Sequence, residues 1–519
     1  MIFASRHWAD SVITTPAAVG NFAGVNLTRT KSVDDILAHS EEPTEHAAEA
    51  APGQAGPGRL RKRLGPFDLM GFGIGIVIGT GIFTLTGVAA KESAGPGVVL
   101  SFALAGAVSL LAALCYAELS SAVPTAGSAY TYAYATIGEV FAWIIGWDLI
   151  LEFALGAAVV ARGWSGYLAE LFDGLPATLF GETAPFNLGA LVVVLVLGVV
   201  AYVGIRESKW VTNFLVVVKV LVCLFVIVAG AFFVTARNWT PFVPEATEPA
   251  ETTSGLTQPL WQALVGVEPS VYGMAGVLSA AAIVFFSYTG FEAVANLGEE
   301  TRNPRRDLPL GLLGTLGICT LLYVGVSAVL TGMVHYSEIN EGAPISAAFE
   351  TVGLGWAAIL VGVAAIAGLT SVILVDIVAM GRIGFAMARD GLLPARLATV
   401  HPQFGTPSAI TLATVAFVGL LAAFVPLDAL AEMVSIGTLF AFTIVSIAVP
   451  ILRRTRPDLH RPFRTPLSPV LPILSAVLCV ALMGNLSIET WLRFVVWLLI
   501  GFVIYFAYGA RSSRVARRS

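Results

Sequence analysis

The stretch GFGIGIVIGTGIF, residues 71–83, places five glycines among isoleucine, valine, phenylalanine and threonine. Glycine costs about 1 kcal/mol relative to alanine at an interior helix position, so this stretch is either a phosphate-binding loop, a close helix-packing face or a broken membrane helix. The dinucleotide-binding fingerprint GxGxxG does not fit, because Gly73-x-Gly75 is followed by Gly79, one residue too late. Close packing through Gly71, Gly75 and Gly79 stays open for the first half of the stretch. It does not account for Gly81 beside Thr80, which favours an unwound turn.

The composition argues against a large soluble enzyme. Of the 519 residues, 56% are hydrophobic and 12% are charged, whereas soluble proteins carry about 25% charged residues. The four cysteines are widely spaced in apolar runs, without a disulfide or metal pattern. Around His335, His401 and His460 we find no grouping of several histidines and carboxylates with the spacing of metal ligands or catalytic residues. We therefore expect a polytopic membrane protein that is not an enzyme and has no catalytic residues, no metal site and no cofactor.

Twelve segments approach the length of about 20 mainly apolar residues that a membrane-spanning helix needs. They lie at about 69–90, 97–118, 139–172, 186–204, 210–235, 276–298, 310–334, 355–382, 407–425, 429–452, 468–486 and 491–509. The predicted fold class is therefore an all-α polytopic membrane protein with twelve transmembrane helices. We expect a mostly disordered cytoplasmic tail over residues 1–58, the twelve-helix domain over 59–509 and a basic cytoplasmic tail over 510–519.

The distribution of lysine and arginine predicts the orientation. With the N-terminus inside, the inner flanks of the twelve segments collect 20 basic residues, whereas the outer loops hold only Lys91, Arg237 and Arg493. Short cytoplasmic loops are enriched in these residues. This asymmetry predicts that both termini are cytoplasmic, as in a multi-pass protein of the plasma (inner) membrane.

Two of the segments are interrupted at corresponding places in the first five and the second five. The first is interrupted at residues 78–82 (IGTGI) and the sixth at residues 287–292 (SYTGFE). Paired interruptions mark the substrate site of transporters built from inverted repeats, and unwound backbone at membrane depth is tolerated only where it lines a cavity or is covered by protein. Its N–H groups can bind a carboxylate and its carbonyl oxygens an ammonium. The two breaks therefore predict a site for the zwitterionic head group of an amino acid.

Four motifs carry a resemblance to a known family. They are the glycine-rich text at 73–83, CYAELSSAVPTAGSAYTYAY at 115–134, FFSYTGFEAVANLGEETRNPRRDLPLG at 285–311 and GRIGFAMARDGLLP at 381–394. The chain resembles an amino acid permease of the amino acid–polyamine–organocation (APC) superfamily, most of all the cationic amino acid transporter branch. This resemblance implies a LeuT-like fold, with inverted five-helix repeats at about 69–235 and 276–452 and two extra helices at about 468–509. It also implies secondary active transport by alternating access.

The predicted substrate site is composite. We expect the amides of Gly79, Thr80 and Gly81 to bind the substrate carboxylate, with Ile78 closing one side. Larger residues at Gly79 and Gly81 should be harmful, because we expect φ > 0 there and close approach of the ligand. The α-ammonium is expected at backbone carbonyls of the second break, and an aromatic side chain there, Tyr288 or Phe291, is a candidate lid. The carbonyls concerned belong to Phe286, Ser287 and Thr289.

Lys219 is the ionisable residue expected to couple transport to protons. It lies inside the fifth segment, within NFLVVVKVLVCLFVIVAG. In proton-coupled relatives a lysine on this helix occupies the place that a sodium ion takes in sodium-coupled ones, and Lys219 matches that position. A buried lysine can gain and lose a proton during the transport cycle. The alternative is that its long side chain reaches the cytoplasmic interface.

Three carboxylates are expected inside the membrane, where ionisable residues are expensive and by default functional. They are Glu152 in the third segment, Glu292 in the sixth and Asp376 in the eighth, and we expect them to tune the side-chain pocket. By its match to the family pattern Asp376 borders that pocket, where relatives usually carry a neutral residue, so it would favour a cationic side chain. Alternatively, Asp376 lies on the proton path, or the carboxylates pair with basic residues such as Arg162 and Arg382.

These observations predict an importer of amino acids that is proton-coupled and favours lysine, arginine or ornithine. The alternatives are an exchanger of amino acids for polyamines and a broad neutral amino acid permease of the same fold. The expected partners are a small-molecule amino acid and the lipid bilayer, with no nucleic acid. The protein is expected to be a monomer or a weak oligomer.

Overall fold

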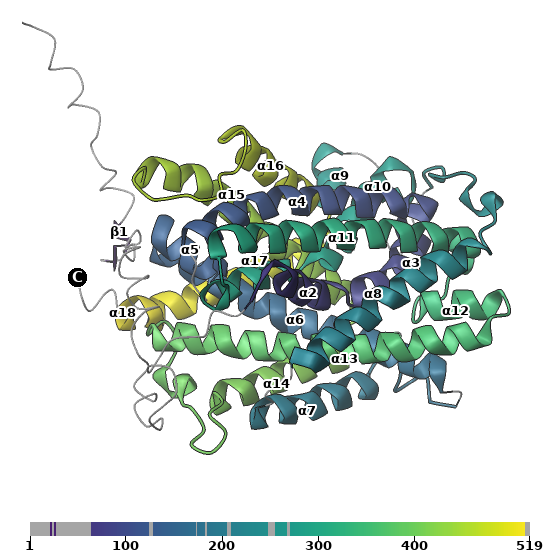
Figure 1. Cartoon of the computed structure of the whole chain (residues 1–519), viewed down its shortest axis with the longest axis horizontal. Helices are drawn as coiled ribbons and strands as arrows, with labels where there is room; N and C mark the ends of the chain where they lie inside the picture. Colours follow the sequence, from purple (N-terminus) through teal and green to yellow (C-terminus); the bar gives the residue numbers. More distant parts are fainter. Residues whose placement is uncertain are drawn as a thin grey trace, which may run out of the picture.

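The helices of the chain run side by side along one direction and form a bundle (Figure 1). The computed structural model describes residues 21–22, 25–26, 64–123, 128–172, 174–181, 184–204, 209–247, 255–266 and 270–513. Two short strands, β1 (Asn21–Phe22) and β2 (Val25–Asn26), form an antiparallel pair. Apart from this pair, the tail expected over residues 1–58 lies outside the described residues, as do residues 514–519.

Each of the twelve expected segments falls on helical structure. In chain order the main helices are α2 (Pro66–Val77), α4 (Val98–Ala122), α6 (Glu139–Leu171), α7 (Leu188–Val203), α8 (Lys209–Ala231), α10 (Gly273–Val284), α11 (Pro304–Met333), α13 (Gly355–Arg389), α14 (Ser408–Phe424), α15 (Leu427–Thr455), α16 (Val470–Met483) and α17 (Ile488–Ile504). Shorter pieces include η2 (Gly81–Leu85), α3 (Thr86–Ala89), η3 (Ala90–Ala94), α5 (Ser128–Thr136), α9 (Leu260–Val265), η7 (Phe285–Tyr288), η8 (Phe291–Glu300), α12 (Pro344–Thr351), η11 (Tyr505–Gly509) and α18 (Ala510–Ser512).

Not every segment is long enough to cross a membrane by itself. In the described part of the chain, eight helical stretches have the length and apolar composition to do so, and α2, α7, α14 and α16 are apolar but shorter. α2 is short because the first expected segment is split after Val77, and its second half continues into α4 as one 42-residue run. Apart from the β1–β2 pair, the described residues thus have the helical character of a multi-pass membrane protein, and the number of twelve membrane crossings stays a prediction.

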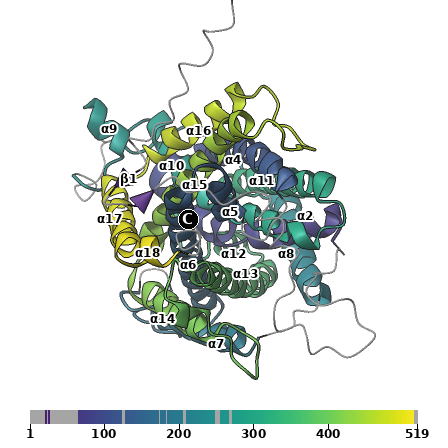
Figure 2. The same cartoon turned by 90° about the vertical axis from the view of Figure 1, so that its left-hand side faces the viewer.

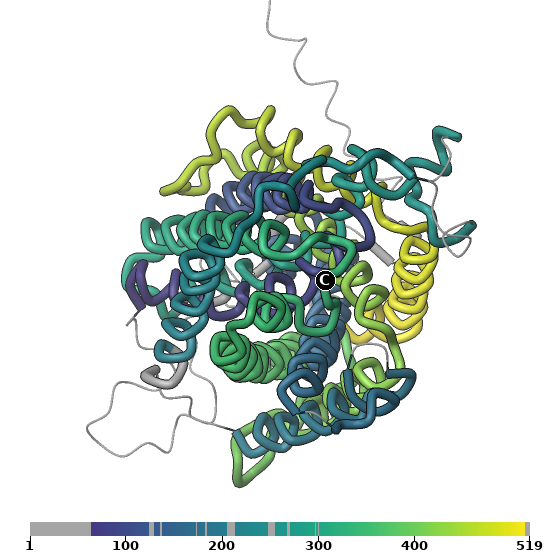
Figure 3. Tube along the Cα trace, turned by 90° about the vertical axis from the view of Figure 1, so that its right-hand side faces the viewer, coloured from purple at the N-terminus to yellow at the C-terminus, as the bar shows by residue number. Residues whose placement is uncertain are grey.

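α6 lies at the centre of the bundle, as the end-on view shows (Figure 2). α13 and α15 pack along α6, whereas α11 packs against α4 and α2. α7 and α14 lie at the outside of the bundle on one side and α16 on the opposite side, whereas α17 and the pair α2 and α8 lie at the other two edges; the opposite end-on view shows the same arrangement (Figure 3). The polar side chains of α6 are therefore enclosed by other helices, and Glu152 and Arg162 are buried.

The buried carboxylate of Glu139, at the start of α6, binds residues near the C-terminal end of the described chain. Glu139 accepts hydrogen bonds from the hydroxyls of Tyr134 at 3.0 Å, Tyr505 at 2.9 Å and Ser513 at 2.6 Å. Tyr134 belongs to α5, whereas Tyr505 and Ser513 belong to the last turns before the C-terminus. Glu139 is completely buried, so these hydroxyls satisfy a carboxylate that would otherwise be costly inside the protein.

Candidate functional site

The first break is present where the sequence predicts it. α2 ends at Val77, and Ile78 is extended, with φ −75° and ψ 95°. The chain is right-handed again at Thr80, with φ −55° and ψ −28°, and continues as η2 from Gly81. The expectation of positive φ at Gly79 and Gly81 is wrong, since neither is among the positive-φ glycines. Both are right-handed or extended, so backbone conformation does not explain why they are glycines.

The second break lies between η7 and η8. Thr289 is extended, with φ −67° and ψ 153°, and Gly290 is left-handed, with φ 95°. Thr289 donates its amide to the carbonyl oxygen of Phe286 at 3.1 Å and its hydroxyl to the same oxygen at 2.8 Å. This carbonyl, one of the three expected ammonium acceptors, therefore already accepts two hydrogen bonds, so Ser287 and Thr289 are the better candidates.

The two breaks touch each other, and this contact explains the glycines. A Cβ on Gly81 would lie 2.5 Å from both the Cα and the Cβ of Ser287, and a Cβ on Gly290 would collide with the side chain of Ile76. Carbon atoms normally approach to about 3.5–4.0 Å, so only glycine fits at Gly81 and Gly290. By contrast, a Cβ on Gly79 would lie 3.7 Å from Val372 Cγ2, which is an ordinary contact.

The close-packing alternative holds for part of the glycine-rich stretch. A Cβ on Gly73 would be 2.9 Å from Val294 and would collide with Thr315, and a Cβ on Gly75 would be 2.7 Å from Val216. These two glycines let α2 approach η8, α11 and α8. Gly71 has no atom within 4 Å of such a Cβ, so the prediction of close packing is wrong for Gly71.

A small buried cavity of about 30 Å³ lies where the breaks meet α6 and α13. The first break contributes Gly79, Thr80 and Gly81, and the second contributes Phe286, Ser287, Thr289 and Gly290. The remaining lining residues come from α2, α6 and α13, and they are Ile76, Val77, Glu152, Phe153, Gly156, Val160, Val372 and Asp376. Eight of the ten predicted substrate-binding residues line this cavity. The other two, Ile78 and Glu292, are buried beside it.

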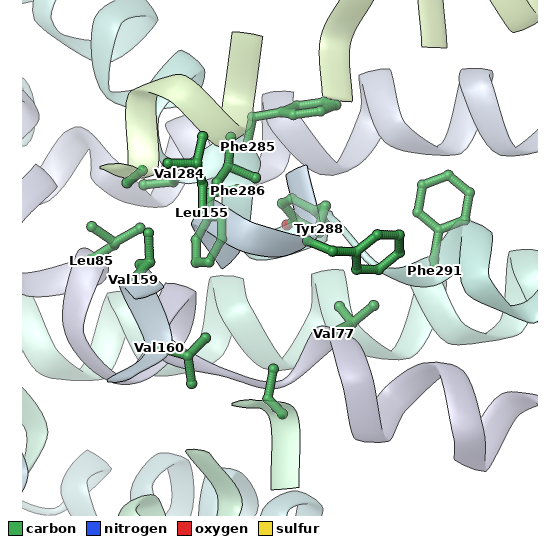
Figure 4. Close-up of a cluster of buried hydrophobic side chains, with 14 of the residues drawn as sticks. Val77, Leu85, Leu155, Val159, Val160, Val284, Phe285, Phe286, Tyr288 and Phe291 are labelled. Carbon is green, nitrogen blue, oxygen red and sulfur yellow. The ribbon is translucent and has the colours of Figure 1, made fainter. Parts of the chain in front are cut away.

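The surroundings of the cavity are mainly apolar, with few polar groups. Val77, Val160 and Phe286 gather with other apolar side chains around the two breaks (Figure 4). Thr80 Oγ1 and Ser287 Oγ are buried and have no hydrogen-bond partner within the described part of the chain. An unsatisfied buried hydroxyl costs about 1–3 kcal/mol, so a polar ligand that reached these groups would be stabilised by them.

The predicted aromatic lid does not line the cavity. The Tyr288 hydroxyl donates to the carbonyl oxygen of Phe102 at 2.8 Å. Phe291 packs edge-on against Tyr116 and Phe442, at centroid distances of 5.8 and 5.1 Å. Both candidate residues therefore support the second break from behind, and Phe286 is the aromatic residue of this break that faces the cavity.

The three predicted carboxylates lie close together. The carboxyl groups of Glu152 and Glu292 interact with each other, and both oxygens of Glu292 accept the amide of Gly290 at 3.0 Å. Asp376 Oδ2 lies 3.2 Å from the position that a Cβ on Gly156 would occupy. The glycine thus lets the Asp376 carboxyl lie directly against α6.

The alternative that the three carboxylates pair with Arg162 or Arg382 is wrong. Arg162 donates to the carbonyl oxygens of Ala422 at 3.0 Å and Ala423 at 3.1 Å, at the end of α14. Arg382 is exposed. Basic side chains suit the C-terminal end of a helix, so Arg162 has a structural role there.

Lys219 lies beside the first break and does not reach the interface. Its side chain is only 1% exposed, and its Nζ donates to the carbonyl oxygen of Gly75 at 2.6 Å. In the described residues, no carboxylate lies within 4.0 Å of this nitrogen, although Asp376 interacts with it electrostatically. The interpretation of a lysine that extends to the cytoplasmic surface is therefore wrong.

The sequence also holds a signal that our interpretation missed. Asp148 lies one helical turn before Glu152 on α6 and is completely buried. Two acidic residues at positions i and i+4 share one face of a helix. The text WDLILE within an apolar segment was sufficient to place a second carboxyl beside Glu152.

Comparisons with known proteins identify the family of the chain. Residues 64–506 match the family described as amino acid permease. The chain is 42% identical over 499 residues to the branched-chain amino acid permease BcaP of Bacillus subtilis (strain 168). This alignment covers 94% of the chain and 98% of BcaP. The chain is also 42% identical over 463 residues to the methylthioribose transporter of the same organism, with coverage of 88% and 95%. Cationic amino acid transporter 4, vacuolar, of Arabidopsis thaliana is 38% identical over 413 residues, with coverage of 78% and 65%.

The helical fold and these matches define a multi-pass membrane permease whose substrates are small molecules. The chain belongs to the amino acid permease family of the APC superfamily, which confirms the resemblance seen in its motifs.

Proposed function

We propose that the protein is a secondary active importer of amino acids that works by alternating access in the plasma membrane, with both termini in the cytoplasm. The observation that carries this proposal is the buried cavity at which two unwound segments from different halves of the chain meet. A cavity of about 30 Å³ has room for water and not for an amino acid. The walls must therefore separate to admit a substrate. Two inverted five-helix repeats, followed by two extra helices, would supply that motion.

The head group of the substrate is recognised by backbone in this proposal. The first amides of a helix have no partner within the helix, and the helix dipole favours an anion there. The turns that restart at Thr80 and Gly81 would thus bind the carboxylate, with the Thr80 hydroxyl beside them. Carbonyl oxygens of Ser287 and Thr289 would accept the ammonium. Recognition by backbone applies to all amino acids, so selectivity must come from the rest of the cavity.

Proton symport is the proposed form of coupling. Lys219 is buried beside the first break and bonded to Gly75, so its protonation would be linked to the conformation of that break. Uptake into proteoliposomes should then rise when the outside is acidified. Counterflow against internal amino acid or polyamine is expected of both a symporter and an exchanger, whereas an exchanger would show no accumulation driven by a pH gradient.

Two substrate classes are supported by different observations. Asp376 lines the cavity, and a buried carboxylate favours a cationic side chain such as that of lysine, arginine or ornithine. Val160, Phe153 and Val372 also line it, and a relative at 42% identity is named a branched-chain amino acid permease. We propose the cationic class first and the neutral, branched-chain class as the second candidate.

Competition uptake with the common amino acids and polyamines separates the two classes. In the cationic case, Asp376→Asn should lower arginine and lysine uptake and spare leucine uptake. Asp428→Asn is the matched control, because Asp428 is an exposed carboxylate away from the cavity. Equal loss of both classes, or no change in either, would show that Asp376 does not select the substrate.

A further inference from the structure

Asp148 is a buried carboxyl to which the proposed substrate site assigns no role. It is 0% exposed, and neither of its oxygens has a hydrogen-bond partner among the residues the structure describes. A carboxylate without a partner in a low-dielectric interior is strongly unfavourable, and such groups become neutral instead. The arrangement in the structure therefore suits a protonated Asp148.

Asp148 is packed closely against α15 and lies near other titratable groups. α15 presents Gly437, where a Cβ would lie 2.8 Å from Asp148 Oδ1, and the next residue, Thr438, interacts with Glu152. The titratable groups that interact with Asp148 are Glu152 on α6 and Tyr116 on α4. Among the residues that the structure describes, no charged side chain forms a hydrogen bond or an ion pair with Asp148.

Asp148 extends a row of carboxyls away from the cavity. Glu152 lines the cavity and interacts with Glu292 behind it. With a rise of 1.5 Å per residue, Asp148 lies about 6 Å along α6 from Glu152, on the side of Glu139. Glu139 marks the end of the bundle where the C-terminal residues dock. The row thus leads from the cavity toward the end of the protein that we propose to be cytoplasmic.

We propose that Asp148 is a further proton-carrying residue, which passes protons between Glu152 and the cytoplasmic side. This inference rests on the proposed proton coupling. When the cytoplasmic side hydrates, the Asp148 carboxyl gives its proton to water and becomes a carboxylate. It then takes the proton of the Glu152 carboxyl, through one bridging water, which leaves Glu152 as the carboxylate. Each step moves one proton and one unit of charge, and no other reactant is needed.

The test compares wild type with Asp148→Asn in proteoliposomes, using radiolabelled arginine and leucine. Asn has nearly the same shape and cannot carry a proton. We expect Asp148→Asn to lose accumulation driven by an inward pH gradient and to retain counterflow, which moves substrate without net proton transfer. Asp148→Glu should restore accumulation. Asp428→Asn is the control and should behave as wild type.

Each outcome separates this inference from the proposal on which it rests. If wild type itself shows no pH-driven accumulation, both proton coupling and the role of Asp148 are wrong. If the pH gradient drives equal accumulation of substrate by wild type and by Asp148→Asn, only the role of Asp148 is wrong. A folded Asp148→Asn that also loses counterflow overturns the inference, because a structural role then suffices. If Asp148→Asn does not fold, Asp148→Ser replaces it under the same criteria.

Discussion

The contact between the two breaks makes a sharp prediction about two glycines of the same motif. Gly81→Ala adds a methyl group 2.5 Å from both the Cα and the Cβ of Ser287. Gly79→Ala adds one 3.7 Å from Val372. Neither glycine has a positive φ, so the two substitutions differ in what the methyl group meets and not in backbone strain.

The expected magnitude follows from the overlap. Carbon atoms pack at about 3.5–4.0 Å, so Gly81→Ala must push the segments apart by about 1 Å. Overpacking of this kind costs about 1–3 kcal/mol, which corresponds to about a 5- to 150-fold loss of apparent affinity if the site bears it. Gly79→Ala makes an ordinary contact of 3.7 Å and creates no overlap, so it should lower uptake less than Gly81→Ala does.

The assay is concentration-dependent uptake of arginine and leucine into vesicles, normalised to the amount of each variant. A thermal unfolding curve for each purified variant reports whether the fold survives. Ser287→Gly combined with Gly81→Ala provides a further check, because it removes the side chain and leaves the Cα of residue 287 in place. The double variant should recover only part of the lost uptake.

Some results would refute this reasoning. If Gly79→Ala lowers uptake as much as Gly81→Ala, proximity to Ser287 is not the cause. The same holds if Gly81→Ala transports as wild type does, since the two breaks would then not need to touch. Complete recovery in the double variant would place the whole conflict in the Ser287 side chain and not in the backbone.

Three further predictions follow from the described contacts. Lys219→Met should abolish uptake driven by a pH gradient and retain counterflow, measured at two external pH values; pH-driven uptake by this variant would contradict the role of Lys219. Glu139→Ala should lower the melting temperature, because it removes three hydrogen bonds that each contribute about 1 kcal/mol, whereas exposed Asp428→Ala should not; equal melting curves would refute this. Gly290→Ala should reduce uptake strongly, since Gly290 combines a φ of 95° with contact to Ile76, and near-normal uptake would show that the second break can relax.

The breaks could be predicted from the sequence because their signal is local. Glycine, serine and threonine within an apolar segment weaken the helix at that point, and the same pattern occurs in both halves. The location of Lys219 near the first break also followed, through the resemblance to a known family. Eight of the ten predicted substrate residues line one cavity for these reasons.

The reasons for individual glycines could not be predicted. Gly81 is needed because Ser287, far away in the sequence, lies against it, and Gly71 has no such neighbour although its spacing fits a packing face. Tertiary contacts of this kind depend on how each helix is rotated and are absent from a local pattern. A local pattern also could not show that the carbonyl oxygen of Phe286 already accepts a hydrogen bond from the hydroxyl of Thr289.

The contact between Gly81 and Ser287 also has a consequence for biosynthesis. Ser287 follows Gly81 by 206 residues, so translation at about 5–20 residues per second separates the two by about 10–40 s. During that interval the first break lies in the membrane without the segment that covers it, and uncovered unwound backbone is unfavourable in lipid. The nascent first half should therefore depend on a membrane chaperone or insertase, and the arrival of the second half would end that dependence.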